Sequence, residues 1–189
     1  MMSKIVVITG MPGVGKTTVL EGALEMANKE GADFRCVNYG DVMFETVQKE
    51  GLAEVRDDMR RLEPEVQKRV QKLAASSISE AGGNTIVDTH ATIKTPKGYL
   101  PGLPEWVLKA LQPTNIVLIE ADPKEIASRR KGDSSRVRDD ELESSMEEHQ
   151  SINRAVAMSY AMYTGATVKI IMNHDLDTAV RELADLLKN

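Results

Sequence analysis

A glycine-rich stretch near the start of the chain has the residue types and the spacing that bind phosphate. Residues 10–17 read Gly-Met-Pro-Gly-Val-Gly-Lys-Thr, which fits the pattern G-x-x-x-x-G-K-[ST] in full. Glycines let the backbone curl so that successive N–H groups face phosphate oxygens. The pattern predicts that a nucleoside triphosphate is held by one run of residues, the P-loop: Gly10, Met11, Pro12, Gly13, Val14, Gly15, Lys16, Thr17 and Thr18.

Three side chains in and after this run are suited to phosphoryl transfer. Lys16 would place its ammonium group on the β- and γ-phosphates, and the Thr17 hydroxyl would bind Mg²⁺. Asp88 closes the apolar run Thr-Ile-Val at 85–87, and an acid at that strand end would hold a water on the metal. We therefore expect ATP and Mg²⁺ as cofactors, with the metal positioned by Thr17 and Asp88.

Arginines supply the second expected component of a phosphoryl-transfer site. Transfer between two polyanions needs positive charge around the migrating group, and the planar guanidinium binds phosphate oxygens in pairs. Arg129 lies at the end of a predicted helix, and Arg136 and Arg138 follow across a short loop that contains Gly and Ser. We interpret residues 129–139 as a lid loop and expect Lys16 and these three arginines to be catalytic.

A further basic cluster lies in a helical insertion between the second and third predicted strands. It contains Arg56, Arg60 and Arg61. The cluster favours a second phosphate-bearing ligand that faces the first, although helices often carry such charges on solvated faces. We take these arginines, together with Asp41 and His90, as candidates for the acceptor site.

The elements that must position these residues alternate between strand and helix. Residues 5–9 form a continuous apolar run that is typical of a strand buried on both faces, and four further strands are expected over residues 34–38, 85–88, 115–120 and 168–172. Helical patterns cover residues 16–30, 41–50, 54–81 (interrupted at Pro64), 105–111, 123–130, 139–163 and 177–188, with Asp41 as the expected N-cap of the second helix. Residues 95–104, rich in Pro and Gly, are expected to form a loop. The pattern predicts one α/β domain of the P-loop type, with a parallel sheet, over residues 1–189.

Composition excludes several other classes of protein. The net charge of −5 argues against extended contact with nucleic acid. No apolar run is long enough to span a bilayer, so we expect no membrane association. A single cysteine, Cys36, excludes an internal disulfide and fits a reducing compartment. We therefore expect a cytoplasmic protein.

Several segments taken together resemble the archaeal-type adenylate kinases over essentially the whole chain. They are the P-loop, Tyr-Gly-Asp at 39–41, Arg-Asp-Asp-Met-Arg-Arg at 56–61, Val-Asp-Thr-His at 87–90, and the arginines of 129–139. The resemblance implies Mg²⁺-dependent transfer of the ATP γ-phosphoryl group to AMP, giving two ADP. It also implies a five-stranded parallel sheet in the order 2-3-1-4-5, an AMP-binding helical segment over residues 38–84, a closing lid and a homotrimer.

The chain departs from the bacterial pattern of the same enzymes. The bacterial enzymes have an arginine shortly after the Gly-Asp pair, where this chain has Phe44 and Glu45, and an Asp-Gly-Phe-Pro-Arg run where this chain reads Asp-Thr-His-Ala-Thr at 88–92. Two arginines that bind AMP in the bacterial enzymes are therefore missing, and Arg56, Arg60 or Arg61 must substitute, with Arg60 and Arg61 as the leading candidates for the acceptor phosphate. The lid contains no cysteine, which excludes a zinc-bound lid.

Two other functions stay open at this level. The same scaffold serves kinases for uridylate, cytidylate or a non-nucleotide acceptor, and the P-loop and the lid arginines do not distinguish them. A non-catalytic nucleotide-binding module is the second alternative. The presence of two arginine clusters favours two phosphate-bearing ligands, and therefore an enzyme.

Overall fold

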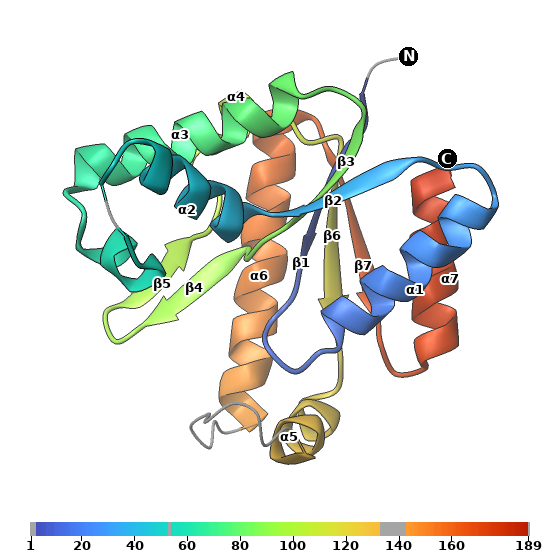
Figure 1. The fold of residues 1–189 in the computed structure, drawn as a ribbon. Coiled ribbons are helices and arrows are strands. Elements are labelled where there is room, and N and C mark those ends of the chain that lie inside the picture. The colour runs from blue at the N-terminus through green and yellow to red at the C-terminus, as the bar shows by residue number, and fades with distance from the viewer. Residues whose placement is uncertain (1–2, 53, 133–142, 189) are drawn as a thin grey trace.

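A central parallel sheet organises the molecule, as the computed structural model shows for the residues that it describes, 3–52, 54–132 and 143–188 (Figure 1). The strands lie in the order β2-β3-β1-β6-β7, and each neighbouring pair is parallel. Their bounds are β1 (Ile5–Thr9), β2 (Phe34–Asn38), β3 (Asn84–Asp88), β6 (Asn115–Glu120) and β7 (Thr167–Met172). If only the five strands of this sheet are numbered along the chain, their spatial order is 2-3-1-4-5. The predicted α/β fold is therefore confirmed.

Helices cover both faces of the sheet and bury two separate apolar clusters. Helices α1 (Lys16–Lys29) and α7 (Leu176–Lys188) cover one face, and α3 (Pro64–Glu80), α4 (Glu105–Leu111) and α6 (Glu143–Thr164) cover the other. Strand β1 serves both clusters, because Val6 and Ile8 lie in the first while Ile5 and Val7 lie in the second. This is why β1 is a continuous apolar run with no polar alternation.

The remaining elements lie toward the carboxyl ends of the strands. Helix α2 (Tyr39–Lys49), the 3₁₀ helix η1 (Arg56–Arg61) and α5 (Pro123–Gly132) complete the described helices. The helical insertion over residues 54–81 is thus confirmed, in two pieces divided before Pro64. Among the described residues, none of the helices has the length and apolar character needed to cross a membrane.

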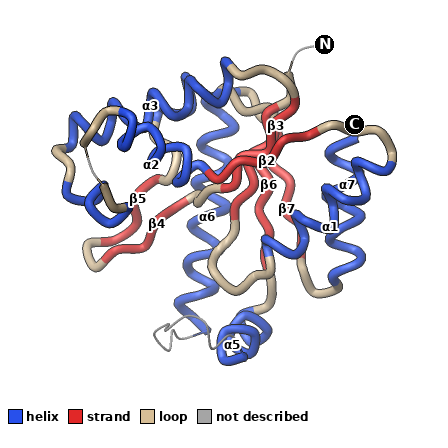
Figure 2. The backbone as a smooth tube through the Cα atoms, viewed as in Figure 1, coloured by secondary structure: helices blue, strands red, loops and turns tan. Residues whose placement is uncertain are grey.

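A small antiparallel hairpin stands apart from the main sheet (Figure 2). Its strands are β4 (Thr92–Thr95) and β5 (Gly98–Pro101), so the expectation of a loop over residues 95–104 was wrong. The expectation was wrong because Gly and Pro usually interrupt strands, whereas here both residue types lie within the hairpin. Gly98 instead ends the tight turn with a φ of 116°, and Pro101 closes the second strand, where the missing N–H is tolerated.

The start of α2 also differs from the sequence prediction. The side chain of Asn38 caps this helix by accepting a hydrogen bond of 3.2 Å from the backbone N–H of Asp41. Asp41 was the predicted N-cap and lies instead inside the first turn. Asn and Asp are both strong N-cap residues. Asn38 is the cap here because its side-chain oxygen accepts from the backbone N–H three residues later in the chain, which is the usual N-cap hydrogen bond.

Candidate active site

The P-loop runs from the end of β1 into the first turn of α1. Gly13 and Gly15 adopt left-handed backbone conformations, with φ of 97° and 83°. Only glycine occupies this region without steric cost, which explains two of the glycines in the motif. Lys16 and Thr17 are the first residues of α1. The positive end of the helix dipole and the Lys16 ammonium group would therefore both attract an anion at this end of the helix.

Side chains from outside the motif hold the carbonyl groups of this loop. Arg130 donates from Nε and Nη2 to the Pro12 carbonyl, at 2.9 and 2.7 Å. Arg129 donates from Nη1 to the Val14 carbonyl at 3.2 Å, and Asn173 donates to the same oxygen from Nδ2 at 2.8 Å. Arg129 and Arg130 lie in α5, whereas Asn173 follows the last strand, β7.

Asn173 is the functional-site residue that the sequence analysis missed. It is almost completely buried, with a relative exposure of 5%. A signal was present, because ligands of α/β sheets bind outside the carboxyl ends of the strands and Asn173 comes directly after β7. Its partner, however, is a backbone carbonyl, which no sequence pattern identifies.

Lys16 and Asp88 meet at the carboxyl ends of the central strands. The Lys16 ammonium group donates a hydrogen bond to the Asp88 carboxylate, and the side chains are 14% and 20% exposed. Asp88 ends β3 beside Ile8 of β1, so the sheet register brings the carboxylate to the P-loop. The amide of Asn38, at the same edge, lies 3.5 Å from Asp88. The structure therefore brings together the lysine and the carboxylate that the sequence placed in one site.

The acceptor candidates separate into groups once their positions are known. Arg56 forms an ion pair with Asp41, and its guanidinium lies against the start of α2, since a Cβ built on Gly40 would be 2.3 Å from its Nη2. Arg61 is directed to solvent, with 85% of its side chain exposed, and pairs with Asp58 at 3.4 Å. The Arg60 side chain lies outside what the structure describes.

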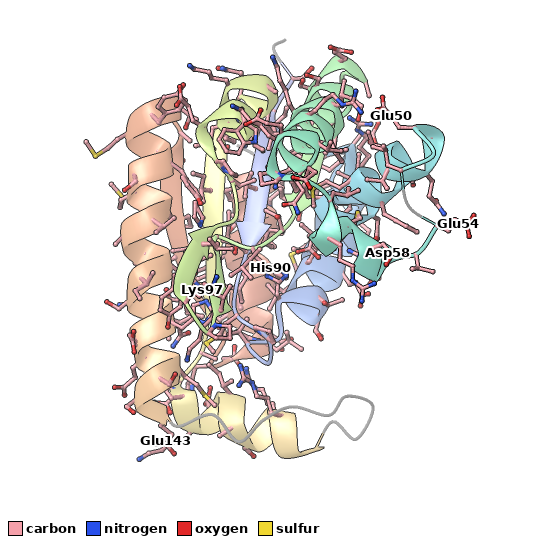
Figure 3. The ribbon with its side chains drawn as sticks, turned by 90° about the vertical axis from the view of Figure 1, so that its left-hand side faces the viewer. Glu50, Glu54, Asp58, His90, Lys97 and Glu143 are labelled. Atoms are coloured by element: carbon pink, nitrogen blue, oxygen red, sulfur yellow. The ribbon has the colours of Figure 1, made fainter. Side chains whose placement is uncertain are left out.

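His90 lies between the hairpin and the segment formed by α2 and η1 (Figure 3). Partial desolvation lowers the pKa of its imidazole below the usual value of 6.5, although the residue as a whole is exposed to solvent, and the positive charge of Lys16 lowers it further. The ring is therefore neutral at pH 7 and presents a donor and an acceptor rather than a charge. Its position near Lys16 and Asp88 keeps it among the candidates.

A buried polar network joins the base of the hairpin to the long helix α6. The Thr92 hydroxyl donates to Asn153 Oδ1 at 2.6 Å and lies 3.1 Å from His149 Nε2. Tyr160 donates to the Ala91 carbonyl at 2.9 Å and accepts from the Leu103 N–H at 3.1 Å. His149 and Asn153 are thus hydrogen-bonded core residues that fix the hairpin on α6.

The predicted lid falls largely outside the described residues. Arg129 is described, but it lies within α5 and is bound to the P-loop rather than free in a lid loop. Arg136 and Arg138 lie in the stretch 133–142, which the structure does not describe. Their catalytic role stays a prediction from the sequence.

Comparison with known proteins places this site in a family. A family model described as an AAA domain matches residues 9–147, more than half of the chain. The adenylate kinase of Methanocaldococcus jannaschii is 56% identical over 192 aligned positions that cover 100% of both chains. The chain belongs to the adenylate kinase family. The adenylate kinases of Methanoculleus marisnigri, 52% identical with 100% of both chains covered, and Methanothermobacter thermautotrophicus, 53% identical with 98% and 100% covered, agree.

The same comparisons support the fold and the activity. A crystal structure of a sugar kinase from Janibacter sp. HTCC2649 aligns with a TM-score of 0.50, covering 97% of this chain and 91% of that one at 14% identity. At that identity the likeness concerns the fold alone. The full-length adenylate kinase relatives identify the chain as an ATP:AMP phosphotransferase, a nucleoside-monophosphate kinase. This confirms the adenylate kinase activity predicted from the sequence and argues against a non-catalytic nucleotide-binding module.

Proposed function

We propose that this adenylate kinase binds ATP on the P-loop and AMP on the segment 38–84, and that Lys16 stabilises the phosphoryl group in transit. The observation that supports this most directly is the meeting of Lys16 and Asp88 beside the P-loop, at the edge where parallel sheets bind ligands. The Lys16 ammonium group pairs with the Asp88 carboxylate. With ATP bound, this ammonium group neutralises charge on the β- and γ-phosphates instead.

The donor set fits Mg²⁺ as the metal of this reaction. Magnesium is usually held by one or two carboxylates, several waters and the substrate phosphates, rather than by a complete protein cage. The described residues contain no cluster of three or more His, Cys, Asp or Glu side chains suited to a metal, whereas Asp88 and the Thr17 hydroxyl flank the P-loop. These two residues would hold the ion, which would neutralise charge on the phosphates.

Arg56 is the leading candidate to grip the acceptor phosphate. Arg56 belongs to η1, and its guanidinium lies beside the N-terminus of α2, where it pairs with Asp41. The side-chain amide of Asn38, which caps α2, lies 3.5 Å from the Asp88 carboxylate. A phosphate at this position would meet the guanidinium, the helix dipole and the exposed N–H groups together. Arg61 lacks such a position, because it lies on the solvated side of η1 and pairs with Asp58. His90, neutral and at the end of β3, would contact the acceptor as a hydrogen-bonding group.

A coupled assay of ADP formation tests the proposal. The purified chain is supplied with ATP and with AMP, UMP, CMP or no acceptor, each with Mg²⁺ or with EDTA. We expect turnover with AMP and Mg²⁺ and less than about a hundredth of that rate with EDTA. Equal turnover with UMP or CMP would contradict the AMP assignment, and full turnover in EDTA would contradict the metal role of Asp88 and Thr17.

The proposal includes a homo-oligomer, a trimer by the resemblance described above. Apolar side chains are exposed on α6 and on the edge strand β7: Met158 (52%), Met162 (85%), Ile170 (40%) and Met172 (46%). Residues 170 and 172 share the face of the sheet that α6 covers, because Val168, two residues earlier, packs against the core on that side. Light scattering after gel filtration would report the mass, and Met162→Lys should lower it if this face is the interface.

The proposal also places the enzyme in the cytoplasm. Cys36 is a free thiol and the one cysteine of the sequence, which suits a reducing compartment. Cys36 is exposed, and partial desolvation together with the nearby Asp88 carboxylate raises the pKa of its thiol, which favours the protonated form at neutral pH. Fractionation of the source cells with an antibody to this chain would test the assignment.

A further inference from the structure

The carbonyl groups of the P-loop are held on the side of the loop away from the ligand volume. Three side chains do this: Arg130 at the Pro12 carbonyl, and Arg129 and Asn173 at the Val14 carbonyl. In a planar trans peptide the carbonyl and the following N–H point in opposite directions, and the described chain contains no cis peptide. A donor that fixes the Val14 carbonyl therefore also fixes the direction of the Gly15 N–H.

We propose that Asn173 is a positioning residue for the donor phosphates, because it sets the orientation of the Val14–Gly15 peptide. The inference rests on the proposed binding of ATP to the P-loop. It assigns a role to a residue outside the motif, on the last strand of the sheet.

Burial and packing fit Asn173 for this role. Its side chain lies directly under Gly15, since a Cβ built on that glycine would be 2.4 Å from Asn173 Nδ2. Its backbone is fixed on two sides: its N–H donates to the Glu120 carbonyl at 2.7 Å, and its carbonyl accepts from Arg129 Nη2 at 2.8 Å. The amide therefore has little freedom to leave the Val14 carbonyl.

Arg129 and Asn173 form one unit around this oxygen. Arg129 bonds the Val14 carbonyl, the Asn173 carbonyl and, at 3.4 Å, the Glu125 carboxylate. An arginine held in this way acts on the ligand through the loop rather than by direct contact. In place of the catalytic role predicted from the sequence, we infer that Arg129 is also a positioning residue, and Asn173 supplies the neutral donor that keeps the Val14 carbonyl in place.

The test compares MgATP with inorganic tripolyphosphate as ligands, measured by titration calorimetry. Tripolyphosphate has no base or sugar, so it reports on the loop alone. We expect Asn173→Ala to weaken the binding of both ligands by the same factor, about tenfold or more, because misdirected backbone donors lose charge-assisted hydrogen bonds. In the coupled assay the KM for ATP should rise by a similar factor, while the KM for AMP stays within about twofold of wild type.

Asn115→Ala is the matched control. The Asn115 amide bridges β6 and β7 by donating to Thr167 Oγ1 at 2.8 Å, but it lies at the amino ends of these strands, away from the P-loop. We expect it to lose comparable thermal stability and to keep both binding constants. Should Asn173→Ala fail to fold, Asn173→Leu keeps the volume without the donor and carries the same comparison.

Three outcomes would overturn the inference, and they are distinguishable from failure of the proposed function. Unchanged binding of both ligands to Asn173→Ala would show that the amide does not position the loop. Weakened ATP with unchanged tripolyphosphate would show a contact with the nucleoside instead. Equal losses in Asn115→Ala would show a general effect of stability. If the wild-type chain itself bound neither ligand, the donor-site assignment would fail first.

Discussion

The P-loop, which we assign to the donor phosphates, joins a buried strand to a helix, whereas the segment assigned to the acceptor lies on exposed helices. On the donor side, the Lys16 and Asp88 side chains are 14% and 20% exposed. On the acceptor side, the Arg56 and Asp41 side chains are 54% and 59% exposed. The same kind of ion pair is thus desolvated in one region and hydrated in the other.

The two regions differ in which groups would bind the ligand, backbone N–H groups in one and side chains in the other. The donor site is built from backbone N–H groups whose directions are fixed by the strands, by α1 and by three supporting side chains. The acceptor site depends on long, solvated side chains, and exposed ion pairs contribute only about 0–1 kcal/mol each. The Arg56–Asp41 pair therefore contributes less to fixing its own geometry than the backbone of the P-loop does.

Loss of Lys16 should break the donor side with the largest effect. We expect Lys16→Ala to lower turnover about a thousandfold, because the ammonium group acts in a desolvated site where charge stabilisation is strong. The fold should survive, since Asp88 retains access to water. The coupled assay and thermal melting measure the two effects. Lys29→Ala, on the exposed end of the same helix, should change neither, and near-normal turnover of Lys16→Ala would contradict the role of the lysine.

Loss of Arg56 should affect the acceptor side alone. We expect Arg56→Ala to raise the KM for AMP by roughly 10- to 100-fold, since a charge-assisted hydrogen bond contributes about 1.5–3 kcal/mol. The KM for ATP should stay within about twofold. Arg61→Ala is the control from the same 3₁₀ helix and should leave both constants unchanged. A larger effect from Arg61 than from Arg56 would reverse the assignment.

Loss of the Tyr160 hydroxyl should weaken the junction between the hairpin and α6. In Tyr160→Phe the buried Leu103 N–H loses its acceptor and the Ala91 carbonyl loses a donor. We expect the free energy of unfolding to fall by about 1–3 kcal/mol, the cost of buried polar groups left unsatisfied. Urea titration measures it. Tyr163→Phe, whose hydroxyl is exposed at the end of the same helix, should cost little, and equal losses would show that the junction is not special.

The smallest expected effect is a pH dependence from His90. Its folded pKa is lowered, so below pH 6.5 the unfolded chain binds more protons than the folded chain. Stability contributed by the neutral ring is therefore complete above pH 6.5 and is lost as the pH falls through the folded pKa. His90→Gln should flatten this part of the stability profile between pH 7 and pH 5, measured by urea titration. An unchanged profile would show that neither partial desolvation nor the charge of Lys16 perturbs the His90 ring in the folded chain.

The strands and the donor site could be predicted from the sequence because both depend on local patterns. The strands over 34–38 and 115–120 have the predicted bounds, and the second of them is defined by an apolar run that follows a turn. The P-loop is contiguous, so its glycines, Lys16 and Thr17 come from one motif. Asp88 followed from the end of an apolar run.

The acceptor side and the loop supports depend on distant partners, which local patterns do not contain. Three arginines lie within six residues at 56–61, and only the orientation of η1 brings Arg56 to α2. Asn173 acts on a backbone carbonyl that lies 159 positions earlier in the chain. The hairpin at 92–101 was missed because its strands are short and contain the residues that usually end strands.

The hairpin also offers a point of attachment for protein engineering. Its base is fixed by Ala91, whose carbonyl accepts from the Gly102 N–H at 2.8 Å and from the Tyr160 hydroxyl. Its tip, at Pro96 and Lys97, is exposed to solvent. Exposed tips on a fixed base accept inserted residues with little cost to the rest of the fold. A short peptide that carries a fluorophore, inserted between Pro96 and Lys97, would therefore label the enzyme without entering the P-loop or the sheet.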